Sequence, residues 1–201
     1  SLLVTRHFYP TIRLPDCPTM NTFTGPTIRL RALEERHIAA MLDAPEDTEL
    51  ERADDAIIFP RSREQRRAEL EAHMRKERTD DSCFLVIETL DGQLVGNIAT
   101  FDCDRRVGAF KYSIVLHRAH WGQGYAREAV TLLLRYYFRE LRFQKVTILI
   151  YSFNDRSIRF HGRFGFIPEG RLRRVVYTNG TYYDELYFGL TAEEFDALDP
   201  M

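Results

Sequence analysis

The stretch HRAHWGQGYAREA, residues 117–129, decides the fold expected for this chain. It joins an apolar run that ends at Leu116 to a long amphipathic segment that begins near Ala126. Gly122 and Gly124 fall at the junction, where glycine serves either a tight turn or the close approach of a ligand to the backbone. A helix that starts at such a turn presents unpaired N–H groups and its positive dipole end, which suits an anion such as a pyrophosphate.

The two glycines could also open a G-x-G-x-x-G dinucleotide fingerprint. Arg127 stands at the third glycine position, however. The junction also lies in the middle of the chain, after strands that pattern as antiparallel, and not in the first βαβ unit of a doubly wound sheet. A nicotinamide cofactor is therefore not expected, and a plain structural turn remains the alternative to an anion site.

Composition limits the classes of protein to consider. The chain has 201 residues, 44% of them hydrophobic, and a net charge of −2. This length suits one domain with a substantial core. The near-neutral charge argues against a nucleic-acid partner. No apolar run approaches the roughly 20 residues that span a bilayer, so no membrane partner is expected.

Cysteine and histidine spacings suggest neither disulfides nor a metal site. Cys17, Cys83 and Cys103 are odd in number and form no CxxC pair, which predicts a reduced, cytoplasmic compartment. His117 and His120 are three residues apart but precede the glycine turn instead of lying on a helix, so no metal is expected.

Hydrophobic periodicity predicts one domain over residues 20–201, preceded by a tail or appended arm at residues 1–19. The expected order is β-α-α-β-β-β-α-β-α-β-β. The expected strands are 27–33, 83–90, 93–102, 106–116 and 145–153, with two more around Asn179-Gly180, and the expected helices are 34–44, 61–78, 126–141 and 154–166. Asp91-Gly92 marks a hairpin. The result is a mixed α/β (α+β) sheet, antiparallel in its first half, with a right-handed βαβ crossover through residues 109–151.

One helix and one charged segment carry further expectations. In the helix at 61–78, Ser62 is the expected N-cap, and Leu70, His73 and Met74 are expected to face inward. Residues 43–55 are strongly acidic, and a solvated loop is their simplest interpretation.

Three motifs together resemble the GNAT acetyltransferase family, in particular its RimJ/RimL-like or polyamine-acetylating branch. The pyrophosphate loop of that family, Arg/Gln-x-x-Gly-x-Gly/Ala, corresponds to Trp121–Ala126, with Trp at the first position, as is frequent in the RimL-like branch. An Asn-x-x-Ser element followed by Gly-Phe is matched by Asn154, Ser157 and residues 165–166. A C-terminal NGxYxDxxxY element is approximated by residues 179–187. The motifs keep the family's order over roughly residues 25–195.

The resemblance implies the GNAT fold, with a central twisted and mostly antiparallel sheet, one splayed parallel strand pair and flanking helices. It also implies acetyl-CoA as cosubstrate and no metal. The residues implied at the cosubstrate are Ile114 and Leu116 for pantetheine, backbone N–H groups of Gln123, Gly124, Tyr125 and Ala126 for the pyrophosphate, Arg127 for added charge, and Asn154 and Ser157. Arg159 and Arg163 would lie toward the 3′-phosphate, or simply face solvent.

The implied chemistry is direct attack of an amine on the thioester, which requires a neutral amine and a proton for the departing thiolate. Where the family often has a tyrosine donor, this chain has His161, whose ordinary pKa near 6.5 suits proton transfer if it is cationic. Ser157 is the competing donor. Asp102 is the first candidate general base, with Asp104, Glu49, Glu51 or a water chain as alternatives.

The acceptor remains open between a polyamine, a protein N-terminus and a small amine. The acidic residues 43–55 would border the acceptor side and favour a polycation. A non-catalytic acyl-CoA-binding module and an unrelated interaction domain are the rival interpretations. The aromatic C-terminal hairpin favours a homodimer unless its rings pack on the chain's own helices; these aromatics are Tyr177, Tyr182, Tyr183, Tyr187 and Phe188.

Overall fold

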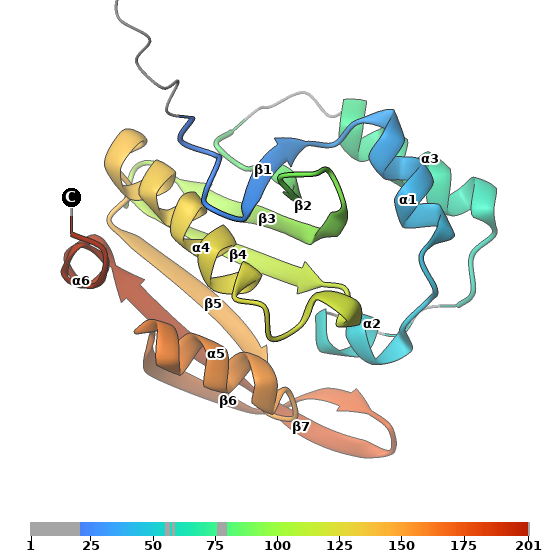
Figure 1. Cartoon of the computed structure of the whole chain (residues 1–201). Coiled ribbons are helices and arrows are strands. Elements are labelled where there is room, and N and C mark those ends of the chain that lie inside the picture. Colours follow the sequence, from blue (N-terminus) through green and yellow to red (C-terminus); the bar gives the residue numbers. More distant parts are fainter. Residues whose placement is uncertain (1–20, 55–56, 58, 76–79, 201) are drawn as a thin grey trace, which may run out of the picture.

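The computed structural model describes residues 21–54, 57, 59–75 and 80–200 (Figure 1). A seven-stranded sheet has the order β1-β2-β3-β4-β5-β7-β6. The strands are β1 (Ile28–Ala32), β2 (Phe84–Thr89), β3 (Leu94–Asp104), β4 (Ala109–Leu116), β5 (Lys145–Tyr151), β6 (Ile167–Thr178) and β7 (Thr181–Thr191). The helices are α1 (Glu35–Asp43), α2 (Thr48–Asp54), α3 (Arg63–Arg75), α4 (Tyr125–Arg135), α5 (Asp155–Phe164) and α6 (Ala192–Leu198), with a 3₁₀ turn η1 (Arg118–His120) and a π turn η2 (Tyr136–Glu140).

Every pair of neighbouring strands is antiparallel except β4 and β5, which are parallel. Their pairing covers only Ala109–Lys111 against Lys145–Thr147. Beyond that point β4 stays paired with β3 as far as Leu116, and β5 stays paired with β7 as far as Tyr151. The two strands therefore part while each keeps its other neighbour. The predicted mixed sheet with one splayed parallel pair is confirmed.

Alternation along β2 shows which helices cover which face of the sheet. Leu85 and Ile87 belong to the large core that also contains Val130 and Leu133 of α4. Val86 points the other way, into a smaller cluster with Ile38 of α1. Successive side chains of a strand point to opposite faces, so α4 and α1 lie on opposite sides of the sheet. In Figure 1, α4 and α5 lie side by side in front of the sheet.

Two short helices were not predicted. α2 lies in the segment that was interpreted as an acidic loop. Its sequence, TELERAD, has no apolar periodicity that would predict a helix, and none of its residues is buried. α6 follows β7 and buries Phe195. Its start is a capping box between Thr191 and Glu194, a local signal that sequence analysis overlooked.

The long helix expected over residues 126–141 changes its winding near the end. The α-helix stops at Arg135, and Tyr136–Glu140 form the π turn. Tyr137 and Phe138 in this turn are both buried. The hydroxyl group of Tyr137 lies 2.6 Å from Oγ1 of Thr100 on β3, so tertiary packing accompanies the wider turn.

In α3 the expected cap is confirmed but the expected inward face is partly wrong. The N–H of Gln65 donates to the Ser62 hydroxyl oxygen at 3.2 Å. Leu70 packs at the edge of the smaller cluster. Met74 is 40% exposed, and His73 is also exposed, although its ring stacks on Phe84. α3 contacts α1 largely through its charged residues, such as Arg66 and Arg67, so little of its surface is apolar contact.

Both predicted hairpin turns form, as the left-handed backbone of their turn residues requires. The φ angle is 92° at Gly92, 49° at Asn179 and 74° at Gly180. The β3–β4 turn differs from prediction: β3 continues to Asp104 and β4 starts only at Ala109. The expected tail at residues 1–19 and Cys17 lie outside the described residues.

The aromatic hairpin is only partly the apolar surface that was expected. Tyr177 and Tyr182 are 63% and 52% exposed. Phe188, in contrast, is buried in the large core, because it points inward from β7. A homodimer through this hairpin remains a prediction.

A buried carboxylate joins β2 to β1 and α1. The side chain of Glu88 is fully buried and receives the guanidinium group of Arg36 at 2.8 Å, together with that of Arg29. His37 Nδ1 accepts from the N–H of Glu34 at 3.0 Å, so the His37 proton lies on Nε2, which donates to Glu88 at 3.0 Å. Despite burial, these hydrogen bonds lower the pKa of Glu88 to about 2.

We expect Glu88→Gln to lower the free energy of unfolding at pH 7 by about 3 kcal/mol, near the lower end for breaking a buried ion pair, since the guanidinium groups reach water. A carboxyl whose folded pKa is depressed stabilises the fold above its unfolded pKa, and that contribution disappears as pH falls toward the folded value. The difference between variant and wild type should therefore shrink between about pH 4.5 and pH 2. Urea unfolding at several pH values measures it.

Glu69→Gln is the matched control, because the ion pair of Glu69 with Arg61 lies at the surface. It should cost no more than about 0.5 kcal/mol. Equal losses in the two variants would contradict the role assigned to Glu88.

Candidate functional site

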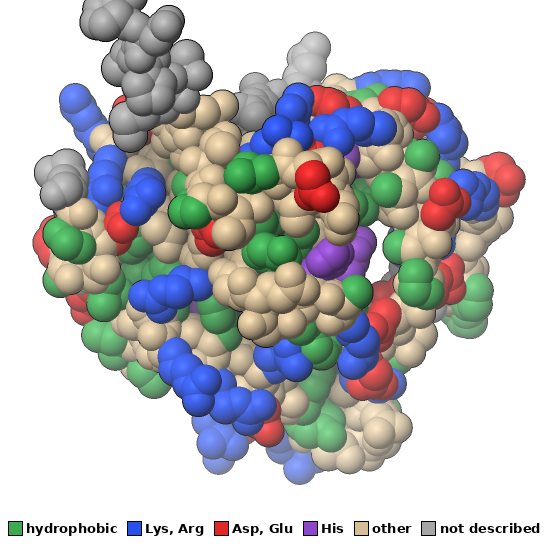
Figure 2. Space-filling model, viewed as in Figure 1, with side chains coloured by type: hydrophobic (Ala, Val, Ile, Leu, Met, Phe, Trp, Pro, Cys, Tyr) green, Lys and Arg blue, Asp and Glu red, His purple; other side chains and the backbone are tan. Residues whose placement is uncertain are grey.

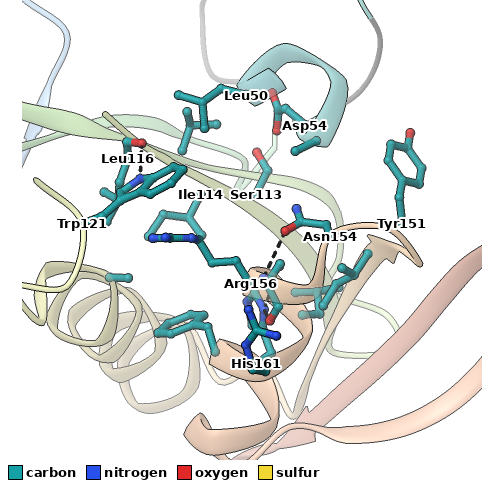
Figure 3. A pocket seen from close by; sticks show the side chains of 18 of the residues that line it. Leu50, Asp54, Ser113, Ile114, Leu116, Trp121, Tyr151, Asn154, Arg156 and His161 are labelled. Carbon is teal, nitrogen blue, oxygen red and sulfur yellow. Dashed lines mark hydrogen bonds between the residues drawn. The ribbon is translucent and has the colours of Figure 1, made fainter. Parts of the chain in front are cut away.

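A cavity of about 1010 Å³ opens where β4 and β5 part. β4, the glycine loop, α4, β5 and α5 all contribute to its walls, and α2 covers it from the side opposite α5 (Figure 3). It is lined by nearly all the residues implied at the cosubstrate: Ile114, Leu116, Gly124, Tyr125, Ala126, Arg127, Asn154 and Ser157. Gln123 is not part of the lining; its side-chain amide donates to the carbonyl of Ala119 at 3.2 Å.

The glycine loop has the geometry that an anion site requires. Gly122 and Gly124 have φ angles of 77° and 85°, which only glycine adopts readily. A Cβ atom at either position would meet no heavy atom within 4 Å, so backbone conformation, not crowding, calls for glycine. Gly124 is the N-cap of α4, and no side chain caps this helix. The N–H groups of Tyr125 and Ala126 therefore lack intrahelical partners and lie at the cavity wall.

Trp121 is a cavity residue that sequence analysis placed in the loop motif but not in the site. Its indole N–H donates to the carbonyl of Leu116 at 2.9 Å, which fixes the ring against the end of β4 (Figure 3). The guanidinium carbon of Arg156 lies 3.4 Å from the centre of that ring. Arg156 belongs to the first turn of α5, so the stack spans two walls of the cavity.

Asn154 and Ser157 form the N-terminus of α5. The side-chain carbonyl of Asn154 accepts the N–H of Ser157 at 3.1 Å, as an N-cap does (Figure 3). One turn later, His161 Nδ1 lies 2.9 Å from the Ser157 carbonyl oxygen and 3.1 Å from its hydroxyl oxygen. The first turn of α5 therefore places the Ser157 side chain at the cavity and beside the imidazole.

The protonation of His161 follows from its partners. A carbonyl oxygen only accepts, so Nδ1 carries the proton. Nε2 then accepts from the hydroxyl group of Tyr112, 2.8 Å away on β4. His161 is 4% exposed, and this burial lowers its pKa to about 4. The imidazole is therefore neutral at neutral pH and both its nitrogens are engaged, so the cationic form that proton donation by His161 would require is not the one favoured here.

Asp102 lies away from the cavity. It occupies an irregularity in the β3–β4 pairing, between Phe101 and Asp104, with a φ angle of 49°. Its side chain is 65% exposed and pairs with Lys111 at 3.0 Å. The carboxylate is exposed and is not part of the cavity lining, and the register shift beside it interrupts the alternation that periodicity assumes. The structure does not bring Asp102 together with Ser157 and His161.

Other carboxylates do line the cavity. Glu49 is one of the alternatives that sequence analysis named, and Asp54 belongs to the acidic segment 43–55 that was expected at the acceptor side, while Glu185 was missed. They come from α2 and β7, far apart in sequence, so no local motif links them. Glu51 and Asp104 are not part of the lining.

Basic residues line the cavity from the opposite pair of elements. Arg127 comes from α4, and Arg159 and Arg163 lie one turn apart on α5. In Figure 2 basic side chains gather over α5. The cavity is thus lined by positive charge near the open end of α4 and by carboxylates from α2 and β7, which suits a ligand that is anionic in one part and cationic in another.

Comparison with known proteins identifies the family. Residues 27–167 match the family described as Acetyltransferase (GNAT) domain. The chain belongs to the GNAT acetyltransferase family. One relative is the SPbeta prophage-derived uncharacterized N-acetyltransferase YokL of Bacillus subtilis (strain 168). The two sequences are 41% identical over 174 residues, which cover 87% of this chain and 95% of the relative. The chain is accordingly an N-acetyltransferase.

The names of some more distant relatives give a polyamine as their substrate. The spermidine N(1)-acetyltransferase of Vibrio cholerae is 25% identical over 99 residues, 49% of this GNAT chain and 57% of the relative. A crystal structure of spermidine N-acetyltransferase from Vibrio cholerae in complex with CoA and spermine has a TM-score of 0.72. It is 19% identical, with 84% of this chain and 97% of that chain covered, which establishes a common fold only.

The described residues of this GNAT domain contain neither a membrane-spanning helix nor a metal-binding cluster. None of its helices there is both long and apolar enough to cross a membrane. No three His, Cys, Asp or Glu side chains within the described ranges gather in a way that could hold a metal ion.

Proposed function

We propose that this enzyme transfers the acetyl group of acetyl-CoA to a primary amine by direct attack of the amine on the thioester. One observation carries the proposal: the uncapped N-terminus of α4 and the wedge between β4 and β5 open into the same cavity, beside Ser157. This arrangement offers an anion site, a slot for an extended chain and a hydroxyl group in succession.

Acetyl-CoA matches these features from end to end. Its pyrophosphate suits the free N–H groups of Tyr125 and Ala126. Its pantetheine is extended and carries amide groups, which suit a strand edge such as that of Ile114 in the open part of β4. Arg159 and Arg163 supply positive charge for the 3′-phosphate. Each of these assignments is implied by the family resemblance, and the polar groups that line the cavity support it.

Ser157 is the proposed proton donor to the departing thiolate. The amine nitrogen attacks the carbonyl carbon, the C–S bond breaks, and the sulfur takes up a proton while the nitrogen loses one. His161 is neutral and directs its Nδ1 proton at Ser157, whose hydroxyl oxygen can accept it. The serine O–H then remains free to donate to sulfur, and the proton that the attacking nitrogen loses returns to the serine oxygen through water, so that no alkoxide is left. His161 acts on this step as a positioning residue.

The proposed acceptor is a cationic amine. Glu49, Asp54 and Glu185 give the side of the cavity opposite α5 a negative lining. Such a lining attracts a protonated amine, and a nearby carboxylate or bound water can take the proton that the amine must lose before attack. The resemblance to spermidine N-acetyltransferase makes polyamines the first acceptors to examine.

The test is release of free thiol from acetyl-CoA with a panel of acceptors: spermidine, spermine, an aminoglycoside, peptides with free N-termini and small neutral amines. We expect acceptor-dependent release, with higher kcat/KM for the cationic members. Binding of acetyl-CoA without release for any acceptor would favour a non-catalytic module, and equal rates for neutral and cationic amines would contradict the acceptor class.

Gly124→Ala tests the pyrophosphate site. The added Cβ forces an unfavourable backbone with φ near 85° and stands at the open end of α4. We expect the Kd for acetyl-CoA, measured by calorimetry, to rise at least about tenfold.

Gly180→Ala is the matched control, because Gly180 has a φ of 74°, an equally open Cβ position and no place in the cavity lining. It should carry a similar backbone penalty and bind acetyl-CoA as the wild type does. Equal loss of affinity in both variants would show that general destabilisation, not the anion site, explains the effect.

Ser157→Ala tests the proton donor. We expect kcat to fall about 100-fold, within the range of general acid catalysis, with little change in the KM for acetyl-CoA. In the wild type, kcat should not decline as pH rises through 6.5, because His161 is neutral there already. A decline near pH 6.5 that His161→Asn abolishes would instead make the imidazolium the acid.

A further inference from the structure

The helix that covers the acceptor side of the cavity is not held by a core of its own. α2 has seven residues, none of them buried. It nevertheless contributes Glu49, Leu50, Ala53 and Asp54 to the cavity wall, and Figure 3 shows Leu50 and Asp54 opposite the first turn of α5. A helix this short has little stability by itself. Side chains outside the helix must therefore fix its place.

Asp47 provides one such attachment. Its Oδ1 accepts the N–H groups of Glu49 and Leu50, each at 3.2 Å, and so caps α2. The same carboxylate receives Nε and Nη2 of Arg118, the latter at 2.9 Å. This guanidinium group lowers the pKa of Asp47 to about 2, so the carboxylate is ionised at any pH at which the amine acceptor can react.

Arg118 connects this attachment to the cosubstrate loop. It is the first residue of η1, the turn that leads from β4 to Gly122. Its guanidinium carbon lies 5.0 Å from the centre of the Trp121 ring, which is itself fixed to the end of β4. The Arg156 stack then continues to α5. A continuous series of contacts thus runs from the cap of α2, past the glycine loop, to the helix that carries Ser157.

The other attachments of this segment lead elsewhere. Arg52 donates to the hydroxyl group of Thr178, in the β6–β7 hairpin. Glu46 pairs with Arg66 of α3 at 3.3 Å. Within the described part of the chain, the pair of Asp47 and Arg118 is the ion pair that joins the cap of α2 to the loop before α4.

We propose that Asp47 and Arg118 are positioning residues that couple the acceptor wall to the cosubstrate loop. A ligand that orders the glycine loop holds Arg118 in place, Arg118 holds Asp47, and Asp47 fixes the start of α2. Binding of the CoA moiety then raises the affinity for the amine acceptor, and by thermodynamic reciprocity the acceptor raises the affinity for CoA. This inference rests on the proposed function.

Asp47→Asn separates the coupling from the cap, because asparagine caps helices as well as aspartate does but cannot form the ion pair. We expect the KM for the best acceptor of the panel to rise about tenfold, within the usual range of coupling between sites. kcat at saturation and the Kd for CoA alone should stay within about twofold of wild type. Arg118→Met should raise the KM for the acceptor by a similar factor, and the double variant should add little to this rise.

The direct measurement is the Kd for CoA in the presence and in the absence of that acceptor. CoA carries no acetyl group, so no transfer occurs during the measurement. The acceptor should tighten CoA binding in the wild type and leave it unchanged in Asp47→Asn. Asp43→Asn is the control, since it removes an exposed carboxylate paired with Arg63 outside the cavity; both the KM for the acceptor and the coupling should match wild type.

Three outcomes would overturn the inference. An unchanged acceptor KM and undiminished coupling in Asp47→Asn would do so while leaving the proposed function intact. A lower thermal midpoint with parallel loss of kcat and of CoA affinity would show that the pair serves stability alone. Failure of the wild type to release thiol with any acceptor would remove the proposed function, and this inference with it.

Discussion

The site depends on the parting of β4 and β5 after a short run of parallel pairs. Each strand keeps its antiparallel partner on the other side, so the sheet holds together while a wedge opens within it. Backbone groups at an open strand edge require partners. A cosubstrate with amide groups can supply them, which makes the break in the sheet the natural place for an extended ligand. The walls of the wedge continue into the glycine loop and the first turn of α5, which bring the polar groups to it.

Burial determines the roles that the polar groups can take. His161 is enclosed between β4 and α5, and the cost of burying a charge keeps it neutral. Its hydrogen bonds to Tyr112 and Ser157 then fix the tautomer. Glu88 is equally buried but meets guanidinium groups, so it remains charged and joins strands and helix. Both side chains are buried, but His161 has no charged partner and is neutral, whereas Glu88 has guanidinium partners and is ionised.

Features that depend on neighbouring residues could be predicted from the sequence, whereas features that depend on contacts between distant segments could not. The glycine loop, the Ser62 cap and the hairpin turns were predictable because each depends on residues that are neighbours in sequence. Asp102 lies at a local irregularity of a strand pair, outside the cavity lining, and periodicity does not register such an irregularity. The missed residue Glu185 reaches the cavity only because β7 folds toward it from a distant part of the chain.

The sequence by itself determined the order of the principal strands and helices, the family resemblance and the loop that suits an anion, because turn chemistry and hydrophobic period act over a few residues. Only the tertiary structure decided the charge state of His161, the place of Asp102 outside the cavity lining and the attachment of α2 through Asp47 and Arg118. These properties arise from desolvation and from contacts between segments far apart in sequence, and neither exists until the chain is folded.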